Sequence, residues 1–117
     1  MPNPKPDRVE FLQGTLEMLV LRTLVFGPKH GYAIAQFIRQ MSNEVLSAEA
    51  GSLYPALQRL EMQKLITAKW EMSDNNRRVR HYRLTPAGRA KLSSSMSRWD
   101  EFVRAMGNVL KPAGVQE

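Results

Sequence analysis

Four side chains that can form hydrogen bonds share one side of the segment 51–66, which reads GSLYPALQRLEMQKLI. Leucines at spacings of four and three residues occupy the other side, and this pattern predicts an amphipathic helix. Hydroxyl, amide and guanidinium groups near the start of such a helix can bind base edges and phosphates. The sequence therefore predicts a helix that reads DNA through Ser52, Tyr54, Gln58 and Arg59.

Positive charge is concentrated directly after this helix. The segment 64–91 holds eight basic and two acidic residues, whereas the rest of the chain has nine of each. A run of like charge is usually only a solvated face of a protein. Here the run adjoins a helix with hydrogen-bonding groups, which favours a surface that faces nucleic acid.

A two-stranded hairpin accounts for the middle of this basic segment. Residues 66–72 alternate between apolar and polar types, 73–76 read SDNN, a turn sequence, and 80–84 form the return strand. Arginine suits phosphate geometry and enters narrow minor grooves. We expect phosphate contacts near the tip of the hairpin, from Arg77, Arg78 and Arg80, with Lys64 and Lys69 as weaker candidates.

Two helices precede the one that reads DNA. The first is predicted over about 14–26 and is ended by a Gly-Pro pair. The second follows His30, which we expect to be a turn residue, and opens at Tyr32. In a helix-turn-helix this helix crosses the DNA backbone. The Tyr32 phenol is expected either to bind phosphate or to be a core side chain with a solvated hydroxyl.

Pro55 limits where the third helix can begin, because a proline inside a helix removes a hydrogen bond and clashes with the preceding turn. One solution is a helix that begins near Ser52 and is capped by its hydroxyl, with 48–51 as a looser turn. The other is a longer helix from Ala48, kinked at the proline. The first is favoured because proline is tolerated in a first turn. Ser52 is then expected to cap the helix, to contact DNA, or to do both.

A heptad pattern marks the last helix. Thr85 is its predicted N-cap residue and Pro86 its first residue. Apolar residues then follow at alternating spacings of four and three, which is typical of a helix that pairs with a second copy. They are Leu92, Met96, Trp99, Val103, Met106 and Leu110. Trp99 is expected either to pack in the dimer or to line a ligand site there.

The order of these elements predicts a fold that is mainly α with a small β-hairpin wing. Three helices, a basic hairpin and a heptad helix make up a winged helix-turn-helix with a C-terminal dimerisation helix. We expect a flexible N-terminal arm and helix lead-in over 1–13, the winged helix-turn-helix domain over 14–84, the dimerisation helix over 85–111, and a tail over 112–117.

Composition argues against several functional classes. The 117 residues suffice for one domain with a core. They include no cysteine and only two histidines, and the sequence has no Gly-rich phosphate loop, so no residue set is suited to catalysis, a metal or a cofactor. No segment resembles a signal peptide or a membrane span. We expect a cytoplasmic protein that is not an enzyme, has no cofactor and has no membrane partner.

Five motifs resemble the PadR family of transcriptional regulators. They are GTLEMLVL at 14–21, HGY at 30–32, GSLYPALQRLE at 51–61, LI at 65–66 and YRLTPAG at 82–88, in the family's order. One departure is Lys64, where the family usually has glycine.

The resemblance implies a homodimeric repressor of transcription that binds double-stranded DNA, with Tyr54 as a DNA contact. It also places Trp99 on the helix where some members bind flat aromatic effectors, so that Met96, Trp99, Val103 and Met106 are candidates for an effector or dimer interface. An alternative is a winged-helix interaction module whose basic wing binds an acidic protein partner.

Overall fold

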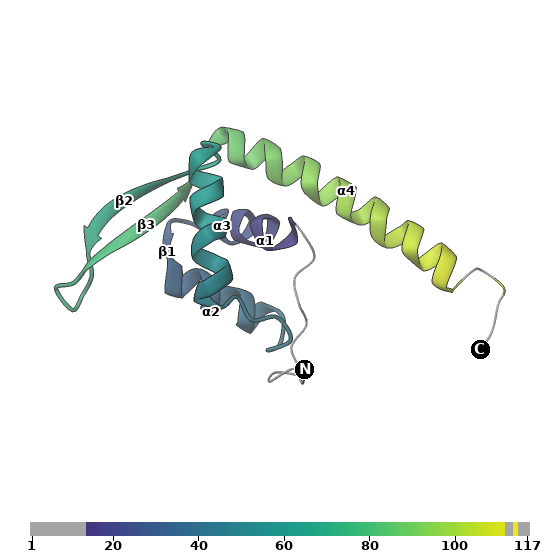
Figure 1. The fold of residues 1–117 in the computed structure, drawn as a ribbon, viewed down its shortest axis with the longest axis horizontal. Helices are drawn as coiled ribbons and strands as arrows, with labels where there is room; N and C mark the ends of the chain where they lie inside the picture. The colour runs from purple at the N-terminus through teal and green to yellow at the C-terminus, as the bar shows by residue number, and fades with distance from the viewer. Residues whose placement is uncertain (1–13, 112–113, 115–117) are drawn as a thin grey trace.

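Three short helices pack around one apolar core in the computed structural model, which describes residues 14–111 and residue 114 (Figure 1). They are α1 (Thr15–Leu24), α2 (Gly31–Met41) and α3 (Ala50–Met62). Each contributes aliphatic side chains at helical spacing, and the most deeply buried include Val20, Leu21, Ile34, Leu53 and Leu57. This is the mainly α arrangement that the sequence predicts. The predicted arm over 1–13 and all of the predicted tail except residue 114 lie outside the described residues.

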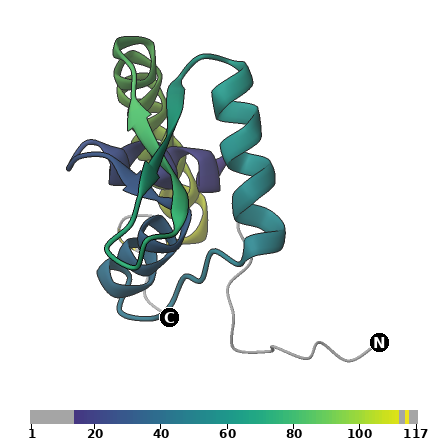
Figure 2. The ribbon, with the colours of Figure 1, turned by 90° about the vertical axis from the view of Figure 1, so that its left-hand side faces the viewer.

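The wing is the hairpin formed by β2 (Ile66–Met72) and β3 (Arg78–Leu84), which pair antiparallel in a register that sets Ile66 opposite Leu84. The base of the wing joins the core through Ile66 and Tyr82, both buried. The return strand begins at Arg78, two residues before the predicted start. Viewed from the wing side, α3 stands beside the hairpin, with its first turn at the level of α2 (Figure 2).

A third strand, which the sequence did not predict, extends this sheet. The two residues of β1 (Lys29–His30) pair antiparallel with β3, so the sheet order is β1-β3-β2. His30 also precedes α2, and its Nδ1 accepts a hydrogen bond from the Ala33 N–H at 3.2 Å. His30 is thus the N-cap residue of α2 and not only a turn residue.

The start of α3 differs from both predicted solutions. The helix begins at Ala50 with Glu49 as the N-cap residue, and the Ser52 side chain forms no cap. The predicted start near Ser52 is therefore wrong, and so is the start at Ala48. Pro55 lies inside the helix and leaves the Gly51 carbonyl without its usual N–H partner. Both Gly51 and Pro55 are exposed, so water can satisfy that carbonyl and the helix continues.

Lys64 ends α3 in the left-handed conformation, with φ of 61°. The Leu65 N–H donates to the Leu60 carbonyl and the Lys64 N–H to the Glu61 carbonyl, at 2.9 and 3.0 Å. This pair of bonds is the Schellman motif, whose left-handed position usually holds glycine because glycine has no Cβ. The departure from the PadR motif at Lys64 therefore leaves the turn intact and puts strain into it.

The last helix, α4 (Pro86–Leu110), runs away from the three-helix body on the side opposite the wing (Figure 1). Thr85 caps it as predicted, since its hydroxyl accepts a hydrogen bond from the Gly88 N–H. Gly88 lies so close to the loop after α3 that an added Cβ would be 2.1 Å from the Leu65 carbonyl oxygen. The buried residues of α4 are Gly88 and Leu92, so the first turns of the helix are the part that is held against the core. Among the described helices, none is long and apolar enough to cross a membrane.

Candidate nucleic-acid interface

The first turns of α2 and α3 enclose a hollow with a volume of about 240 Å³. Tyr32, Gln36 and Arg39 line it from α2, and Ala50 and Tyr54 from α3. The Gln36 side-chain amide donates to the Tyr32 hydroxyl at 3.0 Å. The hollow therefore presents phenol and amide groups beside a helix N-terminus that has no side-chain cap, and such groups bind phosphates. The Arg39 guanidinium already forms an ion pair with Glu44. Gln36 and Arg39 were not predicted; both lie one or two turns after Tyr32 on its helix.

Tyr32 and Tyr54 both keep substantial exposed surface in this hollow. Tyr32 is 67% exposed, which excludes a core tyrosine. Tyr54 is 48% exposed and packs its ring against the backbone of Gly31, because an added Cβ there would lie 2.7 Å from its hydroxyl oxygen. The glycine lets α3 bring this phenol up to the start of α2.

The polar residues of α3 lie on more than one side of the helix. At 3.6 residues per turn, Gln58 lies on the outer side, and Tyr54 and Ser52 lie on opposite flanks of it. Arg59 shares the Ser52 flank, and its Nη2 forms an ion pair with Glu17 Oε1 of α1 at 2.8 Å. The sequence did not predict this ion pair, because the two residues are far apart along the chain. Ser52 and Gln58 are exposed.

The wing arginines also fall into two groups. Arg77 lies exposed in the turn, and Arg78 has its guanidinium 4.9 Å from the centre of the Trp70 ring. Arg80 instead turns back towards α3, where its Nη2 lies 2.9 Å from Glu61 Oε2. The tip of the wing thus presents Arg77 and Arg78, while Arg80 is held at mid-strand. Lys69 is exposed on the opposite face of β2.

Tyr82 lies in β3, two residues after Arg80, and is buried. Burial raises the pKa of the Tyr82 phenol above its ordinary value, while the neighbouring Arg80 guanidinium lowers it. The Glu61 carboxylate raises the pKa further, and the neighbouring Tyr54 phenol acts in the same direction. The phenol is therefore neutral over the physiological range and serves packing.

The two histidines meet in the sheet. His30 and His81 are directly paired across β1 and β3, with ring centres 5.7 Å apart. His81 Nδ1 is 3.5 Å from Glu71 Oε2, and the imidazole is half-buried. Among residues 14–111, no group of three or more His, Cys, Asp or Glu side chains could hold a metal ion.

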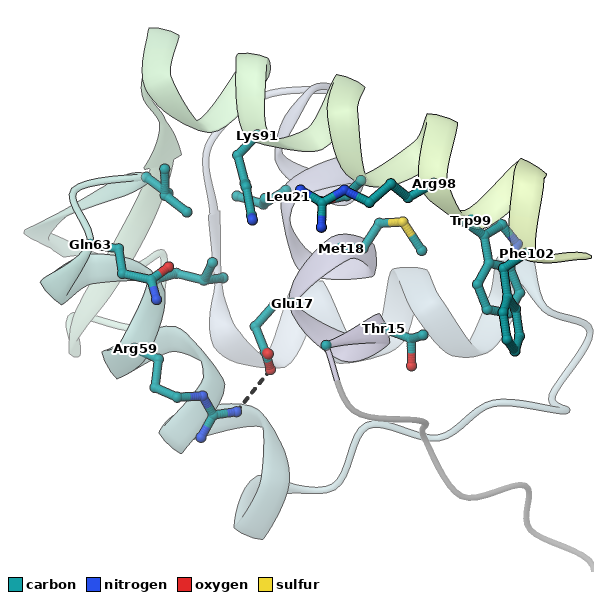
Figure 3. Close-up of a pocket in the computed structure, with 14 residues that line it drawn as sticks. Thr15, Glu17, Met18, Leu21, Arg59, Gln63, Lys91, Arg98, Trp99 and Phe102 are labelled. Carbon is teal, nitrogen blue, oxygen red and sulfur yellow. Dashed lines mark hydrogen bonds and ion pairs between the residues drawn. The ribbon is translucent and has the colours of Figure 1, made fainter.

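A second hollow lies on the far side of α3, between α1 and the middle of α4, with a volume of about 500 Å³ (Figure 3). Trp99 and Phe102 stand together at one end, with ring centres 5.8 Å apart. The Glu17–Arg59 ion pair stands at the other end, and Lys91 and Arg98 project from α4 between them (Figure 3). Trp99, which the sequence offers as a dimer residue or a ligand residue, thus lines a hollow with aromatic and charged walls.

The apolar residues of α4 are exposed from Met96 to the end of the helix. Met96, Trp99, Val103 and Met106 are each between 37% and 49% exposed, although they follow the heptad pattern of a packed seam. Phe102, which the heptad pattern did not include, adds to this surface. Exposed apolar residues in a heptad pattern are typical of a helix that packs against a partner.

The sequence and the fold are both similar to those of known transcriptional regulators. A sequence profile described as the transcriptional regulator PadR-like family matches residues 20–94. A transcriptional regulator from Mycobacterium tuberculosis is 32% identical over 95 residues, which cover 81% of this chain and 85% of that protein.

Among solved structures, a transcriptional regulator from Clostridium thermocellum superimposes with a TM-score of 0.79 at 25% identity, covering 85% of this chain and 96% of the other. A PadR family regulator from Eggerthella lenta gives a TM-score of 0.73 at 31% identity, with 85% and 84% covered. The fold, including the long last helix, is therefore shared with regulators of transcription.

Proposed function

Because the chain belongs to the PadR-like family of transcriptional regulators, we propose that it is a homodimeric, cytoplasmic repressor that binds double-stranded DNA sequence-specifically. The observation that carries this proposal is the hollow between α2 and α3, where two exposed tyrosines, Tyr32 and Tyr54, stand beside an uncapped helix N-terminus. Repression follows from occupancy, since a protein bound over a promoter excludes the polymerase.

The proposed DNA contacts fall into two groups, those that contact base edges and those that bind the phosphate backbone. Tyr54 and Gln58 on α3 face base edges in the major groove, with Ser52 at the same end of the helix. Tyr32 at the start of α2 binds backbone phosphate, and Lys64 adds a charge at the other end of α3. The wing binds the flanking backbone through Arg77 and Arg78. Arg59 and Arg80, both predicted contacts, are already paired with acids.

The proposed dimer forms through α4. Its exposed apolar side chains, from Met96 to Leu110, would be buried by a second copy of the same helix. Two recognition helices held by one two-fold axis would read half-sites about one turn of DNA apart, roughly 34 Å.

The proposed effector is a flat aromatic molecule bound in the hollow beside α4. Trp99 and Phe102 supply the stacking surface, and Arg98 and Lys91 supply positive charge at its edge. The same hollow is lined by Arg59 of α3, so an occupant touches both the recognition helix and the dimer helix. Saturable quenching of Trp99 fluorescence by aromatic compounds, absent in Trp99→Phe, tests this part of the proposal.

A salt titration tests DNA binding itself. The protein should bind random duplex DNA at low salt, and a footprint on its own promoter should give a protected region with two-fold symmetry. If the dimer neutralises roughly 6–10 phosphates, log K should fall with log salt at a slope of about −5 to −9. A binding constant that does not change with salt concentration would refute the proposal. No binding to duplex DNA, with binding to an acidic protein, would favour the interaction module instead.

A further inference from the structure

Arg80 is the point at which the wing is tied to the recognition helix. Its Nη2 donates to Glu61 Oε2 at 2.9 Å, and Glu61 lies in the last turn of α3. The pair is about one-third exposed on both sides, with side-chain exposures of 38% and 32%. Arg80 Nε is fully shielded from solvent. The Arg80 guanidinium thus already has a partner within the protein, although more than a third of the side chain stays exposed.

Trp70 extends this set of contacts towards the tip of the wing. It lies directly opposite Arg80 in the strand register, and the Arg80 guanidinium is 5.6 Å from its ring centre. Arg78 lies over the same ring at 4.9 Å. Cation–π contacts of this length are attractive and orient the guanidinium planes. One indole therefore joins the arginine that is tied to α3 to an arginine at the wing tip.

Apart from this ion pair and these ring contacts, the outermost contact that bears on the angle of the wing is the pairing of β1 with β3, which reaches only as far out as His81 and lies on the edge of β3 away from β2. Beyond Tyr82 the side chains on this face of the hairpin, Trp70 and Met72, are largely exposed. The connection from α3 is a three-residue turn through the strained Lys64. A hairpin attached at its base and free at its tip samples many angles unless a contact at mid-strand holds it.

We propose that Glu61, Arg80 and Trp70 form a wing lock, which holds the wing at a fixed angle to α3 before DNA arrives and presents Arg78 to the backbone. Arg80 is then a positioning residue and not a phosphate contact. Pre-organisation lowers the ordering cost of binding, so the lock raises affinity without touching the DNA. This inference rests on the proposed DNA binding and deepens it.

The direction in which one substitution changes DNA affinity separates the wing lock from a simple electrostatic effect. Removing a negative charge near DNA ordinarily strengthens binding. Asp74→Asn, in the exposed wing turn, should do this by a few-fold and is the matched control. Glu61→Gln removes the same charge and should instead weaken binding about tenfold, because the wing loses its fixed angle.

Arg80→Gln completes the cycle. It should weaken binding as much as Glu61→Gln, and the double variant should be no weaker than either single one. All three should keep the salt slope of the parent protein, whereas loss of a phosphate contact lowers the slope by about 0.9 per site. Stronger binding by Glu61→Gln, additive effects, or a lowered slope for Arg80→Gln would each overturn the lock.

A second readout needs no DNA. In a Trp99→Phe background the remaining tryptophan is Trp70, and its fluorescence anisotropy should fall in Glu61→Gln because the hairpin moves more freely. Unchanged anisotropy would count against the lock even if binding weakened. If the parent protein bound no duplex DNA, the proposed function would fail, while this measurement would still decide whether the wing is held. Thermal unfolding of every variant shows that it is folded.

Discussion

The Tyr54 phenol lies so close to the Gly31 backbone that a Cβ atom added there would be 2.7 Å from the hydroxyl oxygen. This contact joins the first turns of α2 and α3, which form the proposed DNA surface. Gly31→Ala should therefore displace the Tyr54 ring and weaken DNA binding about tenfold, or roughly 1.4 kcal/mol. Stability should change little, because Tyr54 is half-exposed and free to swing into solvent.

A double-mutant cycle checks this cause by electrophoretic mobility shift. In a Tyr54→Ala background the methyl group has nothing to displace, so Gly31→Ala should have almost no further effect on affinity. Equal losses in both backgrounds would mean that the methyl group acts on DNA directly.

Lys64 carries a strain that a single substitution removes. Lys64→Gly should raise the free energy of unfolding by about 1 kcal/mol, because glycine adopts the left-handed conformation without a Cβ clash. Lys64→Ala removes the same charge and keeps the strain, so it is the matched control. Both should weaken DNA binding equally, and only the glycine variant should unfold at higher urea concentration. Equal urea midpoints for the two variants would refute the proposed backbone strain at Lys64.

Tyr82 makes stability depend on alkaline pH. Its folded-state pKa is raised by burial, above the value of about 10 in an unfolded chain. Below pH 10 the phenol is neutral in both states, so its contribution to stability is fully present. As pH rises through the folded-state pKa, the unfolded chain releases its proton first and that stability is lost. Urea unfolding between pH 8 and pH 11 should show this loss.

Tyr82→Phe should flatten the alkaline part of that profile, since it has no proton to release. Tyr32→Phe changes an exposed tyrosine and should leave the loss in place. An unaltered profile in Tyr82→Phe would assign the alkaline loss to another group.

The exposed seam of α4 predicts how the protein assembles. Val103→Glu puts a charge into the middle of the seam and should convert a dimer into monomers in sedimentation experiments. Binding to a two-half-site operator should weaken at least about 100-fold, because the second half-site is no longer linked to the first. Ser97→Glu adds the same charge on the other side of α4 and should leave the dimer intact. A parent protein that sediments as a monomer would refute the proposal that the apolar seam of α4 forms a dimer.

Much of this fold is predictable from the sequence, because hydrophobic periodicity and turn chemistry act over short distances. The Ile66–Met72 strand, the Thr85 cap and the long last helix were all confirmed. The start of α3 was wrong because the rule against internal proline ignores what surrounds it. Here Gly51 and Pro55 both face solvent, so the freed carbonyl can be hydrated.

The remaining features depend on contacts between residues that are distant in sequence. A strand of two residues such as β1 has no periodicity to detect, and histidine is not among the residues that usually cap helices. The pairing of Arg80 with Glu61 and of Arg59 with Glu17 is equally invisible in a charge count, which counts both arginines as free. The site residues themselves, from Tyr32 to Arg80 for DNA and from Met96 to Met106 for an effector or the dimer, stay predictions.

His30 occupies the wing sheet and the start of α2 at once. Protein engineers often move binding specificity between relatives by grafting one hairpin onto another scaffold. In this chain such a graft would cut the ladder between His30 and His81 and disturb the capped turn that carries Tyr32. A functional graft must therefore include Lys29 and His30 together with the hairpin, although about fifty residues of sequence separate them from β3, the strand with which they pair.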